Sequence, residues 1–330
     1  MRSMSGRYLA ALPALAFLVA VVFVPLPYYA EGPGPARDVE PRIHVSGPRT
    51  YPSQGHFVLT SVSFVNGTLP QLIQAWTDPA ESVVPESNLL FPGETQEHAD
   101  VRSISDMDQS KIDAAFVVLS KLTDYPKDHG AGALVEFVDH DHGCPADGVL
   151  FPGDLIVRVN GRDIPDLRTL DRVLDGLPGS ARLAIDVRVG GRINTFHLTR
   201  RPCGEDRKPL LGIRDIPNFQ YDLSFSSGDI GGPSAGLMWA LGLYDLLTPG
   251  DLTGSRTIAG TGTIDGTGTV GVIGGVQNKI VAAQRAGADL FLVPKGNYDG
   301  AREVSGDLPL VPVSSFQEAL DYLEQHQAGS

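Results

Sequence analysis

The sequence predicts a mixed α/β (α+β) fold, and three observations point to it. Apolar residues recur at helical spacing in three segments, 108–122, 237–247 and 276–286, as in helices that bury one face. Short β-prone runs bounded by turn residues fill 131–199, which indicates a small, mostly β unit. A long apolar run precedes these segments, so we expect one transmembrane helix ahead of the folded body.

The N-terminal apolar run extends from Tyr8 to Ala30 without a charged residue. It exceeds the about 20 residues that a helix needs to cross a bilayer. Arg2 and Arg7 precede it and acidic residues follow it, so the positive-inside rule places the N-terminus in the cytoplasm and the rest of the chain outside. We favour an uncleaved signal anchor in the cell membrane, because the nearby site Tyr28–Ala30 lacks a small residue at its first position. A cleavable signal peptide is the alternative.

The composition fits an exported globular body. The chain has 39 acidic and 26 basic residues and a net charge of −13, which disfavours nucleic acid as a partner. The two cysteines, Cys144 and Cys203, are either free or joined in one disulfide, and their spacing does not decide between these states. We expect no metal and no cofactor, because the run His140-Asp141-His142 is more typical of a solvated loop than of a metal site.

A glycine-rich loop, GGPSAG at Gly231–Gly236, leads into the second helical segment. Pro233 suits a first helical position because its missing N–H is not needed there. Ser234 then lies in the first helical turn, among backbone N–H groups that have no intrahelical partner. Such groups can hold a developing oxyanion, and the flanking glycines let a substrate backbone come close.

Lys279 is the candidate base for this serine. A serine hydroxyl becomes a good nucleophile only when a base takes its proton. Lys279 lies in the amphipathic segment Val276–Ala286, and a lysine that faces a packed apolar site is desolvated, which lowers its pKa. Taken separately, a loop of this kind also binds phosphate, and a lone lysine is usually solvated. Their combination favours Ser234 as a nucleophile and Lys279 as its general base.

The segment Thr261–Pro294 carries a family resemblance. It reads TGTIDGTGTVGVIGGVQNKIVAAQRAGADLFLVP and resembles the proteolytic domain of the Lon family, with its threonine-glycine strand, Gly-Gly turn and helix bearing the catalytic lysine. The resemblance implies that Ser234 is the nucleophile, Lys279 the base and Thr261 the hydroxyl that orients the lysine. The residues that support the nucleophile in its loop are Gly232, Pro233 and Ala235.

The chain departs from the family at two points. An acidic residue often stands three positions before the serine in the family, whereas this chain has Gly231, which changes the polarity around the nucleophile. Energy-dependent Lon proteases carry an ATPase, and this sequence has no G-x-x-x-x-G-K-[ST] motif, so we expect action without ATP. Lon-type domains form rings, so a ring-shaped homo-oligomer is compatible with the resemblance.

The middle of the chain contains PADGVLFPGDLIVRVNGRDI, which resembles the PDZ domains of bacterial envelope proteases. Such domains add a peptide as an extra strand beside a sheet edge. The resemblance therefore implies recognition of chain ends or extended peptide segments, and a β domain that only packs against the protease is the alternative. The strand-like run Phe219–Ser226 is a further candidate edge for an extended substrate, or else an ordinary half-buried strand.

We expect the PDZ unit to be inserted within the protease domain, so that the parts on either side of it pack as one fold. The predicted organisation is a cytoplasmic N-terminus and signal anchor at 1–30, a linker at 31–54, the N-terminal part of the protease domain at 55–122, the PDZ domain at 123–203 and the Lon-like proteolytic domain at 204–326.

Together these features predict a single-pass, membrane-anchored serine endopeptidase that acts without ATP on flexible or unfolded envelope proteins. Its PDZ unit would select or position protein and peptide substrates. The alternative is an inactive, membrane-tethered PDZ scaffold or adaptor that keeps the protease fold.

Overall fold

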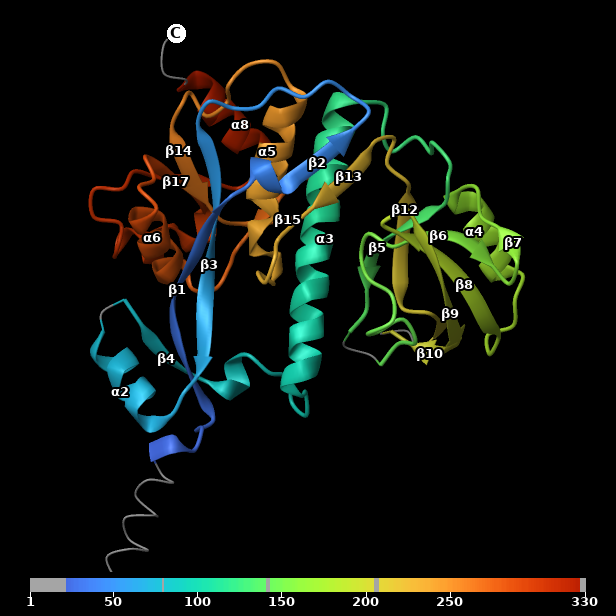
Figure 1. The fold of residues 1–330 in the computed structure, drawn as a ribbon, viewed down its shortest axis with the longest axis horizontal. Helices are drawn as coiled ribbons and strands as arrows, with labels where there is room; N and C mark the ends of the chain where they lie inside the picture. Colours follow the sequence, from blue (N-terminus) through green and yellow to red (C-terminus); the bar gives the residue numbers. More distant parts are fainter. Residues whose placement is uncertain (1–21, 79, 141–142, 205–207, 327–330) are drawn as a thin grey trace, which may run out of the picture.

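A six-stranded mixed sheet carries the larger part of the molecule (Figure 1). The structure is a computed structural model that describes residues 22–78, 80–140, 143–204 and 208–326. The first four strands in sheet order are parallel, and the last two each run antiparallel to their neighbour. In sheet order the strands are β18 (Leu310–Val313), β17 (Leu290–Pro294), β14 (Thr257–Gly260), β3 (His56–Asn66), β1 (Tyr28–Asp38) and β4 (Ser82–Pro85).

Helices bury both faces of the parallel part of this sheet. Alternate strand residues point to opposite faces, so Phe57 and Leu59 join the core with α3, α5 and α8, whereas Val58 joins a second core with α6 and α7. Strand β17 is buried along its whole length, as expected for a parallel strand covered on both sides. The helices are α3 (Gln96–Leu122), α5 (Gly236–Leu247), α6 (Val276–Arg285), α7 (Tyr298–Arg302) and α8 (Phe316–Gln325).

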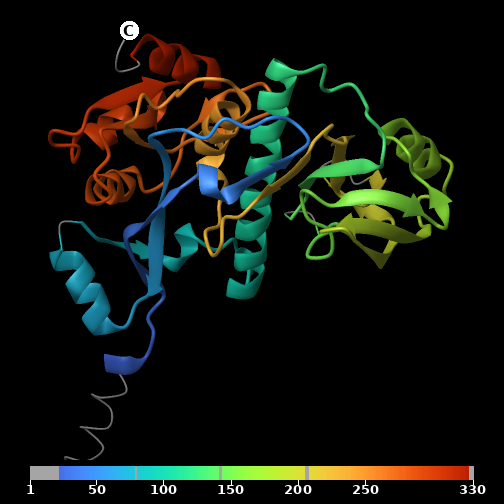
Figure 2. The same ribbon diagram turned by 45° about the horizontal axis from the view of Figure 1, so that its top comes forward.

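The long helix α3 stands between this sheet and a second β unit in both ribbon views (Figures 1 and 2). It packs against α5 on one side and contacts the second unit through β5. The sequence predicted only 108–122 as helical; the observed helix begins earlier, with the Thr95 side chain accepting from the His98 N–H at its start. The first turns carry mostly polar side chains, so no apolar periodicity marked them.

The second β unit has its own antiparallel sheet and its own apolar core. A disulfide joins Cys144, in the loop after β5, to Cys203 in β10, which answers the question that the cysteine spacing left open. The short β-prone runs expected across 131–199 correspond to strands β5 to β9. In sheet order the strands are β12 (Ile213–Pro217), β5 (Ala133–Val138), β6 (Leu155–Val159), β8 (Arg182–Val189) and β9 (Arg192–Thr199), with β7 (Arg162–Asp163) beside β6 and α4 (Leu167–Asp175) as the helix.

The N-terminal part of the described chain corrects one expectation. The linker expected at 31–54 is wrong for its first half, because Tyr28–Asp38 is strand β1, which pairs with β3 and β4. Pairing on both edges, with β3 and with β4, gives this Gly- and Pro-rich segment its order, and sequence pattern did not reveal it. Most of the expected transmembrane run lies in residues 1–21, outside the described residues. Across the part of the chain that the structure describes, no helix has the length and apolar character needed to span a bilayer.

The remaining elements are short. They are α2 (Leu69–Thr77), the strand pair β2 (Ile43–Ser46) and β13 (Asp222–Phe225), the pair β10 (Arg201–Cys203) and β11 (Lys208–Leu210), the pair β15 (Thr263–Ile264) and β16 (Val270–Gly271), and the 3-10 turns η1 (Glu40–Arg42), η2 (Glu86–Asn88), η3 (Pro233–Ala235) and η4 (Lys295–Asn297).

Candidate active site

The nucleophile candidate lies in a tight turn ahead of α5. Gly232 adopts a φ of +80°, a conformation that favours glycine, and its N–H donates to the Ser103 carbonyl of α3 at 2.7 Å. Pro233, Ser234 and Ala235 then form the 3-10 turn η3, with Pro233 at the start and Ala235 buried. The Ser234 N–H therefore belongs to a first turn, where it has no intrahelical acceptor.

The structure brings Ser234, Lys279 and Thr261 together. Lys279 Nζ lies 2.5 Å from Ser234 Oγ and 3.1 Å from Thr261 Oγ1. The Thr261 hydroxyl donates to the Ser234 carbonyl at 3.0 Å, and the Gly262 N–H donates to the same carbonyl at 2.8 Å. Strand β14 ends just before Thr261, so the main sheet fixes this hydroxyl relative to the turn that holds Ser234.

Burial sets the protonation of the lysine. The Lys279 residue is 3% exposed and Thr261 is fully buried. Loss of solvation penalises the ammonium form and lowers the pKa of Lys279 to about 8, while the Glu31 carboxylate opposes this by favouring the charged form. An amine with this pKa is partly neutral near physiological pH, and at 2.5 Å it can accept the Ser234 proton.

A Gly-Gly turn lets the lysine helix approach the sheet. Gly275 caps the N-terminus of α6 with a φ of +64°, and a Cβ there would lie 2.6 Å from Glu31 Oε1 and 2.7 Å from Val62 Cγ2. A side chain at this position would clash with Glu31 and Val62 unless one of them or α6 shifted, and the positive φ would strain it as well. Sequence reasoning missed Glu31 as a site residue because it treated that segment as a linker; the antiparallel pairing of β1 with β3 was the feature it lacked.

Gly231 stands where the family that this segment resembles often has an acidic residue, and close packing explains why a glycine is found here. A Cβ at Gly231 would lie 2.2 Å from the Ser103 Oγ and 3.1 Å from the Ser103 carbonyl oxygen. An acidic side chain therefore does not fit at this position while α3 packs as it does. Ser103 of α3 occupies the space that such a side chain would need.

A cavity of about 840 Å³ opens beside Ser234 and Lys279. Strand β3 lines one side of it from Thr60 to Val65. The pairing of β3 with β14 stops at Leu59, so beyond this point β3 has β1 on one edge and no described strand on the other. The expected substrate edge at Phe219–Ser226 lies elsewhere: it contains β13, which pairs with β2 and lines a separate groove of about 960 Å³ between α3 and the second sheet.

Comparison with known proteins agrees with this site. Residues 226–324 match the Lon protease (S16) C-terminal proteolytic domain, and the match supports serine peptidase chemistry. The Lon protease of Rickettsia bellii is 26% identical over 153 residues, which cover 44% of this chain and 20% of that protein. The chain thus spans about a fifth of the length of this curated relative.

Two solved structures are similar to part of the chain. They are the PDZ domains of the SdrC-like proteins of Listeria innocua and Listeria monocytogenes, each 21% identical. Each match covers 26% of this chain, with 92% of the first domain and 86% of the second, at a TM-score of 0.23.

Proposed function

We propose that this chain is a serine endopeptidase in which Ser234 is the nucleophile and Lys279 the general base. The observation that carries the proposal is the 2.5 Å approach of the buried Lys279 amine to the Ser234 hydroxyl, within the segment that matches a Lon proteolytic domain. Neutral Lys279 takes the hydroxyl proton as Ser234 attacks the scissile carbonyl, and the ammonium so formed gives that proton to the leaving amine as the peptide bond breaks, which returns Lys279 to its neutral form. Water activated by the same amine then hydrolyses the acyl-enzyme.

Two further groups complete the proposed chemistry. The Ser234 N–H, in the first turn, is the donor that we assign to the oxyanion. Thr261 holds the lysine through its hydroxyl.

The substrate lies as an extended strand along the free edge of β3, which the cavity exposes next to Ser234 and which offers main-chain hydrogen bonds to any sequence. Because the substrate must be extended to pair with β3, the enzyme can cleave only tails, loops and unfolded chains.

The second sheet is proposed to act as the PDZ domain of this enzyme. Strand β12 is its edge strand, with β5 on one side, and α4 lies close to both. A peptide that adds to the free edge of β12, beside α4, uses the recognition mode expected of such domains. We assign the whole unit from β5 to β12 to an insertion within the protease domain. The core around α5 joins residues that precede the unit, such as Val39, to residues that follow it, such as Leu323, whereas the core of the unit uses only residues between Ala133 and Leu211.

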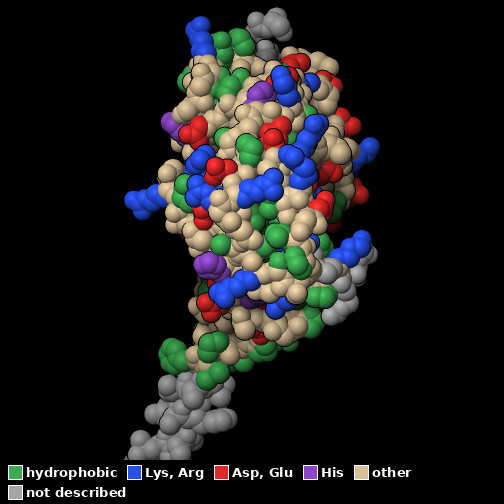
Figure 3. All heavy atoms as spheres, turned by 90° about the vertical axis from the view of Figure 1, so that its right-hand side faces the viewer, with side chains coloured by type: hydrophobic (Ala, Val, Ile, Leu, Met, Phe, Trp, Pro, Cys, Tyr) green, Lys and Arg blue, Asp and Glu red, His purple; other side chains and the backbone are tan. Residues whose placement is uncertain are grey.

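We place the enzyme at a membrane, with its body outside the cytoplasm. Hydrophobic side chains gather on the surface at the end of the molecule where the described chain begins (Figure 3), and the apolar run of the sequence precedes this point. Helix α2 exposes Leu69, Ile73 and Trp76, and Trp76 is 82% exposed; such a stripe beside an anchor suits a lipid interface. The Cys144–Cys203 disulfide is typical of an oxidising compartment.

Degradation of a labelled, permanently unfolded protein by the full chain, without ATP, tests the proposal. We expect cleavage by the wild type and none by Ser234→Ala or Lys279→Ala. The matched controls are Ser224→Ala and Lys295→Ala, which change an exposed serine and an exposed lysine and should cleave normally. Equal cleavage by all five proteins would rule out the dyad, and a folded but inactive wild type would leave the scaffold alternative.

A further inference from the structure

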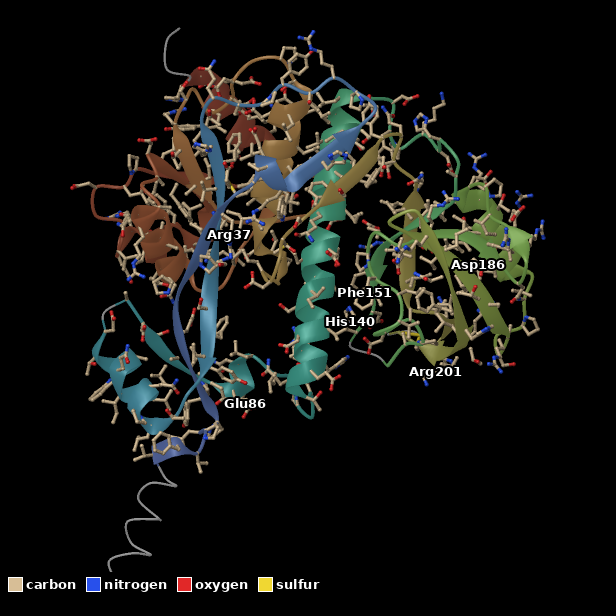
Figure 4. The ribbon with its side chains drawn as sticks, in the orientation of Figure 1. Arg37, Glu86, His140, Phe151, Asp186 and Arg201 are labelled. Carbon is tan, nitrogen blue, oxygen red and sulfur yellow. A yellow bond between two sulfur atoms is a disulfide. The ribbon has the colours of Figure 1, made fainter. Side chains whose placement is uncertain are left out.

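Three ligand-type side chains meet where α3 faces the second sheet. His98 comes from the first turns of α3, His140 follows β5, and Asp147 lies in the loop after the disulfide cysteine. One ligand atom of each lies within 4.8 Å of the others. Asp147 bridges the two rings, with Oδ2 3.0 Å from His98 Nε2 and Oδ1 2.6 Å from His140 Nδ1. Figure 4 places His140 on the side of its unit that faces α3.

On its other side, the buried ring of His140 meets no hydrogen-bond partner from the part of the chain that the structure describes. Its side chain is only 5% exposed, and among the described residues no group makes a hydrogen bond to its buried Nε2. The sequence favoured a solvated loop here, and that expectation is wrong for His140, because Asp147 draws the ring inward; Asp141 and His142 lie outside the described residues. This nitrogen faces away from Asp147, so Nδ1 is the atom that His140 offers to the cluster, and a buried water is the usual partner of such an orphaned nitrogen.

A carboxylate lies behind His98. Glu94 Oε1 lies 3.6 Å from His98 Nδ1, on the far side of the ring from Asp147. Glu94 is itself held by Arg102, whose Nε donates to it at 2.9 Å, and the Glu94 side chain is only 3% exposed. A carboxylate on the second nitrogen of a histidine is the outer support that metal-binding histidines usually have.

We propose that His98, His140 and Asp147 form a zinc site that joins α3 to the second sheet. Two imidazoles and one carboxylate suit Zn²⁺, with a fourth position for water or another donor, whereas Ca²⁺ and Mg²⁺ prefer oxygen ligands alone. Ligands at 2.0–2.1 Å from a tetrahedral zinc stand about 3.3 Å apart; each histidine nitrogen already lies 2.6 or 3.0 Å from an oxygen of Asp147, and one ligand atom of each residue lies within 4.8 Å of the others. The ion would neutralise Asp147 and fix the position of one unit against the other.

Zinc titration of the chelator-treated full chain tests this site. We expect the wild type to bind one equivalent by calorimetry and by metal analysis after dialysis. His98→Ala and Asp147→Asn should each lose this binding, and Glu94→Gln should weaken it by about 10–100-fold. The matched control is His44→Ala, which removes an exposed histidine on β2 and should bind as the wild type does.

Cobalt provides a second measurement that does not depend on a single variant. Co²⁺ should give the visible absorption of a tetrahedral site with the wild type, and added Zn²⁺ should abolish that absorption. Circular dichroism confirms that each variant is folded. The proposal is overturned if the folded wild type takes up no zinc equivalent, or if His98→Ala and Asp147→Asn keep it. Neither result depends on the peptidase activity, so the two proposals fail separately.

Discussion

The pH dependence of cleavage follows from the burial of Lys279. A general base must be neutral, and a pKa of about 8 makes about 9% of the amine neutral at pH 7 and about 90% at pH 9. We therefore expect kcat/KM to rise about tenfold between these values and then level off. With the ordinary lysine value of 10.5, the neutral fraction at pH 7 would be about 300-fold smaller.

Glu31 supplies the perturbation that separates this cause from others. Its carboxylate favours the protonated form of Lys279, so Glu31→Gln should lower the pKa of Lys279 and move the rising limb to lower pH. Relative to its own plateau, this variant should be more active at pH 7 than the wild type. Glu303→Gln, which changes an exposed carboxylate at the end of α7, is the matched control and should leave the limb in place.

The assay is kcat/KM against pH, measured with a fluorescently labelled unfolded protein, because this ratio reports the ionisation of the free enzyme. Circular dichroism across the same range shows that the fold persists. A limb near pH 10, or a profile that Glu31→Gln does not move, would refute the argument. The first outcome would mean that burial does not lower the pKa of Lys279, and the second that Glu31 does not act on this amine.

Three further predictions follow from the same contacts. Lys279→Met should be inactive yet more stable than the wild type at pH 7, by at most about 3 kcal/mol, because its folded state no longer holds a buried ammonium. The folded pKa of Lys279 lies below the unfolded one, so the free energy of unfolding of the wild type rises between pH 8 and 10.5. The difference between the two proteins, measured by urea unfolding, should therefore shrink over this range. Thr261→Val removes a bond to Lys279 and one to the Ser234 carbonyl, so kcat should fall about 10–100-fold at nearly constant KM; an unchanged kcat would show that packing alone orients the lysine. Replacing Cys144 and Cys203 by serine opens a loop with a sequence separation of 59 and should lower the free energy of unfolding by up to about 4 kcal/mol, whereas a loss below 1 kcal/mol would contradict the entropic account.

Local sequence patterns were sufficient for the nucleophile turn and the lysine helix. Pro233 at a first turn and the apolar spacing around Lys279 are local signals, and the structure has both elements where they were expected. Glu31 and Ser103 were missed because their roles depend on chain segments that are distant in sequence. Strand β1 shows no clean alternation, and only its pairing with β3 brings Glu31 to the lysine.

The helix α3 connects the two halves of the molecule. Its Ser103 carbonyl accepts from Gly232 and so fixes the turn that holds Ser234. About one and a half helical turns before Ser103, His98 contacts Asp147 of the second β unit. On the other side of Ser103, Asp113 forms a hydrogen bond with Glu136 of β5, and burial is the main reason that the pKa of Asp113 is raised to about 7. The position of the second sheet and the geometry of the nucleophile turn therefore depend on one rigid element. If a ligand of the second sheet shifted α3, the shift would reach the turn that holds Ser234 through the hydrogen bond between the Ser103 carbonyl and the Gly232 N–H.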